Sequence, residues 1–472
     1  MILAVLYFMS NGGEALILSI EHNGVLVDAC GLSGEQKQAN IFPAHPSGMQ
    51  LSRNRWLLLI ATRGVRQHDD DHSIVYQLRA DTPDGTLLRE GFLQQTCSDW
   101  DPFQDGSSYV CLLRHAMGFG IPKGALIKGK PAQNANRFAA IWCRSAAGVL
   151  DSATGLYTYN PELERKTLEV VWCQFRLNDT DDDIEILRKP EKMRQNGYAS
   201  GTAFCHAEQA GFMIANLVPP VPFNDNCCEW ISAMHSGIGI MVVKFRYDDR
   251  TGIYEWVETG PARLGNEQFA LSEPTLARGD DAWIIGVRVR YINPQQVPDW
   301  AGDRARDRGH TGWIKVEDPF REMPFPKIVE DPHREAPMTI YRCADGVIRL
   351  FSGDLKKSPY GQRRDPIYCW DVNTDDFSVS NRRVVFDSVK AGVFPDDPKL
   401  PRCTSFACVF PHVGGAAQTV AHRVMCYRYL PEMDPGNPPI SPEQMLAHGI
   451  YYASIRYQNE YPPFWHFTEK SN

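Results

Sequence analysis

Histidine, tyrosine and arginine side chains in the first half of this chain are the groups best suited to chemistry. His115 lies between an apolar run and a Gly- and Pro-rich segment that ends at Ala125. A constrained loop that follows a strand is a frequent location for catalytic side chains. The sequence therefore predicts His115 as a proton-transfer group.

Two arginines, Arg194 and Arg246, are candidates for binding a carboxylate, because a guanidinium can hold both carboxylate oxygens at once. Tyr198 and His235 lie near them in the sequence, and tyrosine and histidine can move protons at a carbon beside that carboxylate. Such a set suits removal of the C5 proton of a uronic acid, with His235 binding the substrate. The alternative is that these arginines pair with Asp and Glu on the edges of strands.

A second polar cluster follows the first strongly apolar run of the chain. It contains Arg63, Arg66, His68 and the acidic run 69–71. We expect Arg63 to bind substrate, and carboxylate oxygens are the ligands that Ca²⁺ prefers. A solvated acidic turn is the alternative for this segment.

A third cluster consists of Cys408, His412 and His422. Alternation along a strand would direct Cys408 and His412 to one face, and with Cys369 or Cys343 the set would hold a structural Zn²⁺. The thirteen cysteines are an odd number without a C-x-x-C pair, which favours reduced, unbridged thiols. We expect that no cofactor is required, with Zn²⁺ or Ca²⁺ as the possible structural ions.

The elements that must position these groups are short strands separated by polar turns. Runs such as 54–60, 280–287 and 345–351 repeat one pattern, a polar turn followed by an apolar strand. Repetition of this kind is typical of radial all-β arrays. The sequence predicts an all-β, seven-bladed β-propeller of four-stranded antiparallel blades that forms a single domain over 1–472. Loop insertions are expected near 292–337 and 430–445, and the last strand, 449–457, should complete a blade begun by an N-terminal strand.

Composition excludes some classes of partner. The formal net charge is −8 and the pI is near 5.9, which argues against nucleic acid because phosphate binding needs a basic surface. The apolar start, 1–9, is too short to span a membrane and lacks a basic region before it, so a cytoplasmic protein is favoured, or a secreted one if the start was trimmed. We expect an anionic glycan as the partner, no membrane partner, and a monomer or small homo-oligomer.

Several phrases resemble those of a known superfamily, the sialidase-type propellers. The phrases that carry this resemblance are 57–63, 272–276 and 283–288. A narrower resemblance is to the seven-bladed polysaccharide lyases, namely the ulvan lyases and the rhamnosyl-glucuronate lyases. It rests on His115 with the segment 119–125, on 136–138 and on Trp142.

The lyase resemblance implies β-elimination at a uronate by two His, one Tyr and two Arg. His115 matches the first His, and Arg194 and Arg246 fall near the expected arginines. Asn134 stands at the second His position and Asn178 at the Tyr position, for which Tyr198 would have to substitute. Asparagine can orient a substrate but cannot act as a base at neutral pH.

Three functions therefore stay open. The first is a lyase that uses His115, Arg194 and Arg246. The second is a sialidase-like glycoside hydrolase, which needs two carboxyl groups or a Tyr–Glu pair. Its available carboxyl groups belong to Glu273, Asp70 and Asp99. The third is a propeller that binds glycan or protein without catalysis, which the two asparagines favour.

Overall fold

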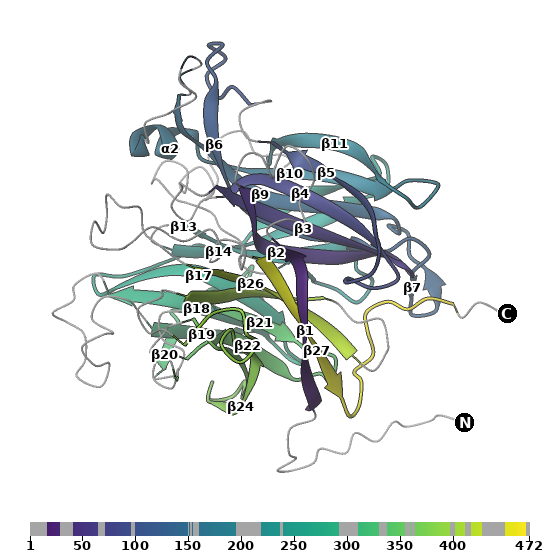
Figure 1. Ribbon diagram of the computed structural model, residues 1–472, viewed down its shortest axis with the longest axis vertical. Helices are drawn as coiled ribbons and strands as arrows, with labels where there is room; N and C mark the ends of the chain where they lie inside the picture. The colour runs from purple at the N-terminus through teal and green to yellow at the C-terminus, as the bar shows by residue number, and fades with distance from the viewer. Residues whose placement is uncertain are drawn as a thin grey trace.

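The structure of this chain is a computed structural model (Figure 1). It describes residues 17–28, 41–64, 71–95, 100–149, 151, 153, 160–194, 219–236, 239–291, 310–329, 338–354, 359, 364–396, 402–410, 417–426 and 449–468. Within these ranges the regular structure is almost entirely β-strand. The one helix among them is α2 (Pro161–Thr167), where the Asn160 side chain accepts hydrogen bonds from the backbone of the first turn.

The strands of the described residues form six antiparallel blades. Blades 1 and 2 share one sheet through a single pair, Asp71 with Leu113. Blade 1 contains β2 (Ile41–Ser52), β3 (Arg55–Gly64), β4 (Asp71–Ala80) and β5 (Leu87–Gln94). Blade 2 contains β6 (Tyr109–Ile121), β9 (Arg137–Val149), β10 (Glu169–Leu177) and β11 (Ile184–Lys192). Blade 3 contains β12 (Val221–Pro222), β13 (Glu229–Ser236), β14 (Gly239–Asp248) and β15 (Ile253–Thr259).

The second half of the chain builds the other three blades. Blade 4 contains β17 (Phe269–Arg278), β18 (Trp283–Tyr291), β19 (His310–Val316) and β20 (Lys327–Val329). Blade 5 contains β21 (Thr339–Arg342), β22 (Ile348–Gly353), β23 (Ile367–Val372) and β24 (Val379–Phe386). Blade 6 contains β25 (Arg402–Val409), β26 (Ala417–Cys426), β27 (Gly449–Tyr457) and β1 (Ile17–Asp28). Three short strands lie outside this scheme, namely β7 (Leu126–Ile127), β8 (Lys130–Pro131) and β16 (Arg263–Leu264).

Over the described residues the fold is a six-bladed β-propeller. The all-β class and the four-stranded antiparallel blades are confirmed, but the predicted count of seven blades is wrong. Part of the predicted insertion near 292–337 is regular structure, because β19 and β20 lie within it. The other predicted insertion, near 430–445, lies outside the described residues.

Ring closure follows the prediction made for the last strand. β27 lies beside β1 in an antiparallel ladder from Ile17–Tyr457 to Asp28–Gly449, so one blade joins the two ends of the described chain (Figure 1). The four strands of blade 6 therefore come from segments more than 350 residues apart.

One strand of each blade lies innermost, beside a central channel. These strands are β2, β6, β12, β17, β21 and β25, and β17 contacts β21, β21 contacts β25, and β25 contacts β2. All six run in the same direction, since each is the first strand of its blade. We call the end where they begin the strand-start mouth and the end where they finish the strand-end mouth. In Figure 1 α2 belongs to the strand-start side, on the left, and β7 to the strand-end side, on the right.

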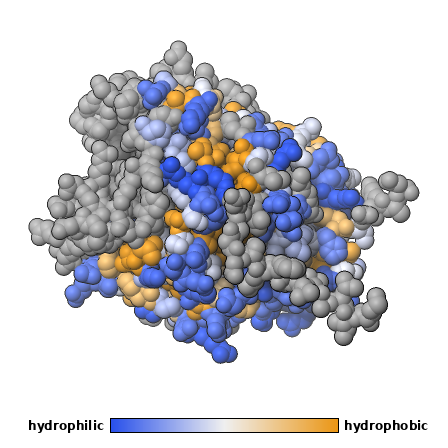
Figure 2. All heavy atoms as spheres, turned by 90° about the horizontal axis from the view of Figure 1, so that it is seen from below, coloured by the Kyte–Doolittle hydropathy of each residue, from blue (hydrophilic) through white to orange (hydrophobic). Residues whose placement is uncertain are grey.

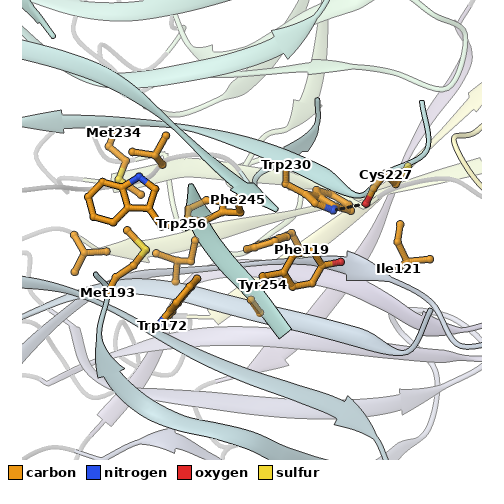
Figure 3. Packing of buried hydrophobic residues seen from close by; sticks show 14 of the residues in the cluster. Phe119, Ile121, Trp172, Met193, Cys227, Trp230, Met234, Phe245, Tyr254 and Trp256 are labelled. Atoms are coloured by element: carbon orange, nitrogen blue, oxygen red, sulfur yellow. Dashed lines mark hydrogen bonds between the residues drawn. The ribbon is translucent and has the colours of Figure 1, made fainter. Parts of the chain in front are cut away.

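Large apolar side chains fill the space between blades. Between blades 2 and 3, Phe119 lies with its ring centroid 4.9 Å from that of Tyr254 and 5.3 Å from those of Trp230 and Phe245 (Figure 3). The Trp230 indole donates to the Cys227 carbonyl at 2.9 Å, so the aromatic layer keeps its polar edge satisfied. This packing fixes the innermost strands, and with them the walls of the channel.

The outer surface mixes polar and apolar side chains. Figure 2 shows one face, on which hydrophilic residues predominate and hydrophobic ones form smaller groups. Among the described residues, no helix has the length and apolar character needed to cross a membrane.

Candidate functional site

Four of the six innermost strands carry a one-residue bulge at the same level of the channel. In β2, β6, β17 and β25 the ladder advances three residues on the inner strand against two on its neighbour. The bulged steps are Pro43 to Pro46, Arg114 to Met117, Ser272 to Thr275 and Ser405 to Cys408. Bulges of this kind redirect a side chain and are enriched next to active sites.

The repeated bulges form a ring, which we call the bulge ring. The residues that line the channel cavity follow within two positions of each bulge, beginning at Gly48, Gly118, Leu276 and Val409. The bulges therefore lie on the strand-start side of that cavity. They place His45, Glu273 and the backbone of His115 at one level along the innermost strands.

Glu273 has the most unusual geometry of the three. Its backbone has φ +47°, a left-handed conformation that costs a glutamate about 1 kcal/mol or more. Its carboxylate accepts a hydrogen bond from Arg288 of the adjacent strand at 2.8 Å, and both side chains are mostly buried. The neighbouring Ser272 and Thr275 are also buried. The bulge thus holds a charged carboxylate in a strained, enclosed position on an innermost strand.

His115, the leading prediction, lies inside the β6 bulge rather than at the start of a loop. The strand continues to Ile121, and Gly120 with φ +145° lets the chain pass close to the Arg137 carbonyl, where a Cβ would come within 2.2 Å. The Gly-rich segment is therefore part of the channel wall. The His115 side chain lies outside the described side chains.

Other predicted residues lie on the strand-start side but do not share one position. Arg63 is near the end of β3, opposite Phe42, and its side chain is outside the described ones. His235 is buried beside the hairpin between β13 and β14. Arg194 is exposed and lines a surface cleft with Trp172 and Glu255, between blades 2 and 3. Tyr198, Asp70 and Asp99 lie outside the described residues.

Arg246 and Asn134 lie on the strand-end side. Arg246 is 57% exposed and pairs with Glu229 at 2.6 Å. Such an ion pair at a strand edge was the alternative to substrate binding for this arginine. On β14 it lies six residues beyond the partner of His235, which is about 20 Å along a strand. The structure therefore does not bring Arg246 together with His235.

Asn134 is fully buried among the loops of blades 2 and 3. Its amide donates to the Cys227 carbonyl at 2.9 Å and to the Tyr254 hydroxyl at 3.0 Å, and burial raises the pKa of that hydroxyl. Asn178, the other asparagine of the lyase resemblance, accepts from the backbone of Asp182 and Asp183 in the turn between β10 and β11. These contacts stabilise the loops in which the two asparagines lie.

The predicted zinc cluster does not assemble. Cys408 is paired with Ala421 in the ladder, so His422 points to the opposite face of the sheet. The His422 ring instead packs 4.6 Å from that of Phe386. Burial raises the pKa of the Cys408 thiol to about 12, so without a metal this thiol is protonated at pH 7. No group of three or more metal-ligating side chains occurs among the described residues, and His412 lies outside them.

The C-terminal segment, residues 458–468, lies across the strand-end mouth, and we call it the plug. Its backbone pairs with Leu126 through His466, at 2.7 and 3.0 Å, and Thr468 accepts from the Arg53 guanidinium at 3.0 Å. The Tyr461 ring lies 4.2 Å from the Arg342 guanidinium, and Trp465 is buried in the core between blades 2 and 3. Sequence analysis missed the plug, because a short Pro- and aromatic-rich segment carries no periodic signal.

A cavity of about 170 Å³ lies behind the plug, lined by residues of all six innermost strands. Its polar residues include Gln50, Arg278, Arg342 and Tyr341. Burial raises the pKa of the Tyr341 hydroxyl well above its usual value and that of the Cys343 thiol to about 11. Both groups are therefore neutral at pH 7, and the arginines carry the charge of this wall.

Comparison with known proteins agrees with this architecture. No protein family profile and no curated protein matches the sequence. A protein of unknown function from Dyadobacter fermentans is similar in structure, with a TM-score of 0.52 at 9% identity over 93% of this chain and 100% of that one. At this identity the similarity shows the fold alone.

Two weaker structural similarities are to glycosidases. The Trypanosoma rangeli sialidase has a TM-score of 0.48 at 9% identity. The similarity covers 88% of this chain and 54% of the sialidase chain. An α-L-arabinofuranosidase from Fusarium graminearum has a TM-score of 0.48 at 8% identity, over 92% of this chain and 98% of that one.

Proposed function

We propose that this propeller is a glycan-cleaving enzyme of the glycoside hydrolase type, with its reacting groups on the bulge ring and Glu273 as the central carboxylate. The observation that carries the proposal is the strained backbone of Glu273 together with its 2.8 Å contact to Arg288. Strain of this kind persists where surrounding structure enforces it, and it is concentrated at functional sites.

The chemistry of Glu273 suits a glycosidic bond. Glycoside hydrolysis passes through an oxocarbenium-like transition state whose positive charge an ionised carboxylate can stabilise or trap. Arg288 favours the charged form of the carboxylate, so Glu273 suits a nucleophilic or charge-stabilising role rather than proton donation. The expected ligand is an anionic glycan.

A second candidate function is β-elimination at a uronate. It is favoured by the equivalent position of His115, which belongs to the matching bulge of β6. A neutral imidazole there would remove the C5 proton. The carboxylate would need an arginine other than Arg246, which is engaged with Glu229 on the strand-end side.

Substitution of Glu273 by Gln tests the proposal. The panel comprises sialosides, arabinofuranosides, ulvan and rhamnosyl-glucuronate oligosaccharides, with reducing ends and ultraviolet absorbance both measured. We expect wild type to release reducing ends without an unsaturated product, and Glu273→Gln to lower kcat at least about a hundredfold. Growth of the unsaturated product, lost in His115→Ala, would favour elimination instead.

Glu229→Gln is the matched control. Glu229 is also a mostly buried glutamate in an ion pair with an arginine of the neighbouring strand, but it lies on the strand-end side. We expect this variant to keep its turnover. Equal losses in the two variants, or full activity in Glu273→Gln, would contradict the proposal. Glycan binding without any product would identify a binding platform.

A further inference from the structure

The cavity behind the plug contains buried hydrogen-bond donors that have no acceptor. Arg278 Nη1, Arg342 Nε and Trp465 Nε1 are all shielded from solvent, and none has a partner in the described part of the chain. All three residues line the cavity. A buried donor without an acceptor costs about 1–3 kcal/mol, so a ligand that offers an acceptor to these three donors would gain stability from them.

Other nitrogens of the two arginines bond the protein, and Arg342 Nη1 donates to the Arg278 carbonyl at 3.4 Å. Arg278 Nη2 pairs with Asp225 at 2.9 Å, and Arg342 Nη2 pairs with Asp280. The side chains of Asp225 and Asp280 are 55% and 87% exposed, so water screens their charge. Asp225 also binds Lys128 at 3.2 Å, the first cause of its lowered pKa, followed by Arg278. The buried side of this cluster therefore carries an excess of positive charge.

The remaining walls are apolar. Phe119, Trp230, Leu276 and Phe464 face the cavity together with prolines that precede β13. These walls offer few partners for the several hydroxyl groups around a sugar ring, so they do not suit a glycan. They suit a ligand with a compact apolar body.

We infer that this cavity binds a small organic anion, a carboxylate on a ring of about the size of benzoate. A cavity of about 150 Å³ is large enough for benzene, and this one has about 170 Å³. The carboxylate would accept from Arg278 Nη1, Arg342 Nε and Trp465 Nε1. Gln50 Oε1, a buried acceptor without a partner in the described residues, would accept from a hydroxyl group on the ring.

This site is independent of the proposed glycan site. The cavity lies on the strand-end side of the bulge ring and shares neither Glu273 nor Arg288 with it. Its occupant would contact residues of every blade and of the plug, and would hold them together.

Calorimetric titration of the full chain with benzoate, benzamide and acetate tests the inference. We expect benzoate to bind at least about tenfold more tightly than benzamide, which lacks the charge, and than acetate, which lacks the ring. Trp465→Phe removes the indole donor and keeps an aromatic ring, and Arg342→Gln removes the charge. Each is expected to weaken benzoate binding about tenfold.

Arg176→Gln is the control, because Arg176 forms an exposed ion pair with Glu185 on blade 2 and does not line the cavity. Its affinity for benzoate should equal that of wild type. Circular dichroism of each variant verifies folding. No binding of benzoate, equal binding of benzoate and benzamide, or wild-type affinity in folded Trp465→Phe and Arg342→Gln would overturn the inference.

Discussion

Asn134, which the lyase resemblance places at a catalytic position, has contacts that hold two blades together. Its amide lies where the loops of blades 2 and 3 meet, and both donated hydrogen bonds cross between the blades. The amide replaces contacts that water would otherwise make with the Cys227 carbonyl and the Tyr254 hydroxyl. Loss of this amide should therefore lower the free energy of unfolding.

For Asn134→Ala we predict a loss of about 1–3 kcal/mol in the free energy of unfolding, because two buried groups lose their donor. Turnover per folded molecule should stay unchanged. Denaturant unfolding followed by fluorescence, together with assays on the folded protein, measures both. Unchanged stability with lost turnover would instead restore the catalytic interpretation.

At the residue scale, sequence reasoning located some groups and misjudged their surroundings. His115 was assigned to a site, and it does lie on an innermost strand. Arg246 has the ion pair foreseen as its alternative. The face of Cys408 could not be predicted, because the bulge between Ser405 and Cys408 changes the alternation of β25, and a bulge leaves no signature in residue type.

At the scale of elements, the strand signals were reliable. The runs 54–60, 280–287 and 345–351 correspond to β3, β18 and β22 with their preceding turns, and 449–457 is β27. The predicted number of blades was wrong because it was estimated from residue spacing, which does not distinguish loops from strands. The loop 122–136 contains its own hairpin, β7 with β8, and the connection before β10 contains α2. Such lengths mimic an additional blade.

The plug is the element whose removal is most informative. Truncation after Gln458 removes the pairing with Leu126, the Tyr461 contact with Arg342 and the buried Trp465 side chain. Deleting a buried Trp side chain alone costs about 3–5 kcal/mol. We predict a fall in the free energy of unfolding of at least that size, measured by denaturant titration. Truncation after Thr468 keeps these contacts and is the control; equal stability of the two truncations would contradict the role given to the plug.

At the scale of the whole molecule, β1 closes the ring. Its ladder with β27 joins segments from opposite ends of the described chain, so it acts on the arrangement of all blades. The entropy lost on closing so large a ring is offset by this ladder and by the packing of blade 6 against its neighbours.

Deletion of residues 1–28 should therefore weaken the entire propeller. We predict a loss of several kcal/mol, since each net hydrogen bond of the ladder contributes about 1 kcal/mol, and a broader unfolding transition than that of the full chain. Differential scanning calorimetry measures both, and size-exclusion chromatography reports expansion. An unchanged transition would show that blade 6 is complete without β1.

The plug also determines how a polymer could meet this protein. A channel with two free mouths lets a long chain thread through and slide, whereas residues 458–468 lie across one mouth here. Substrate and product would have to use the same doorway. A tunnel with one open end favours removal of units from chain ends over processive cutting. Product release through that same end would then limit the rate of turnover.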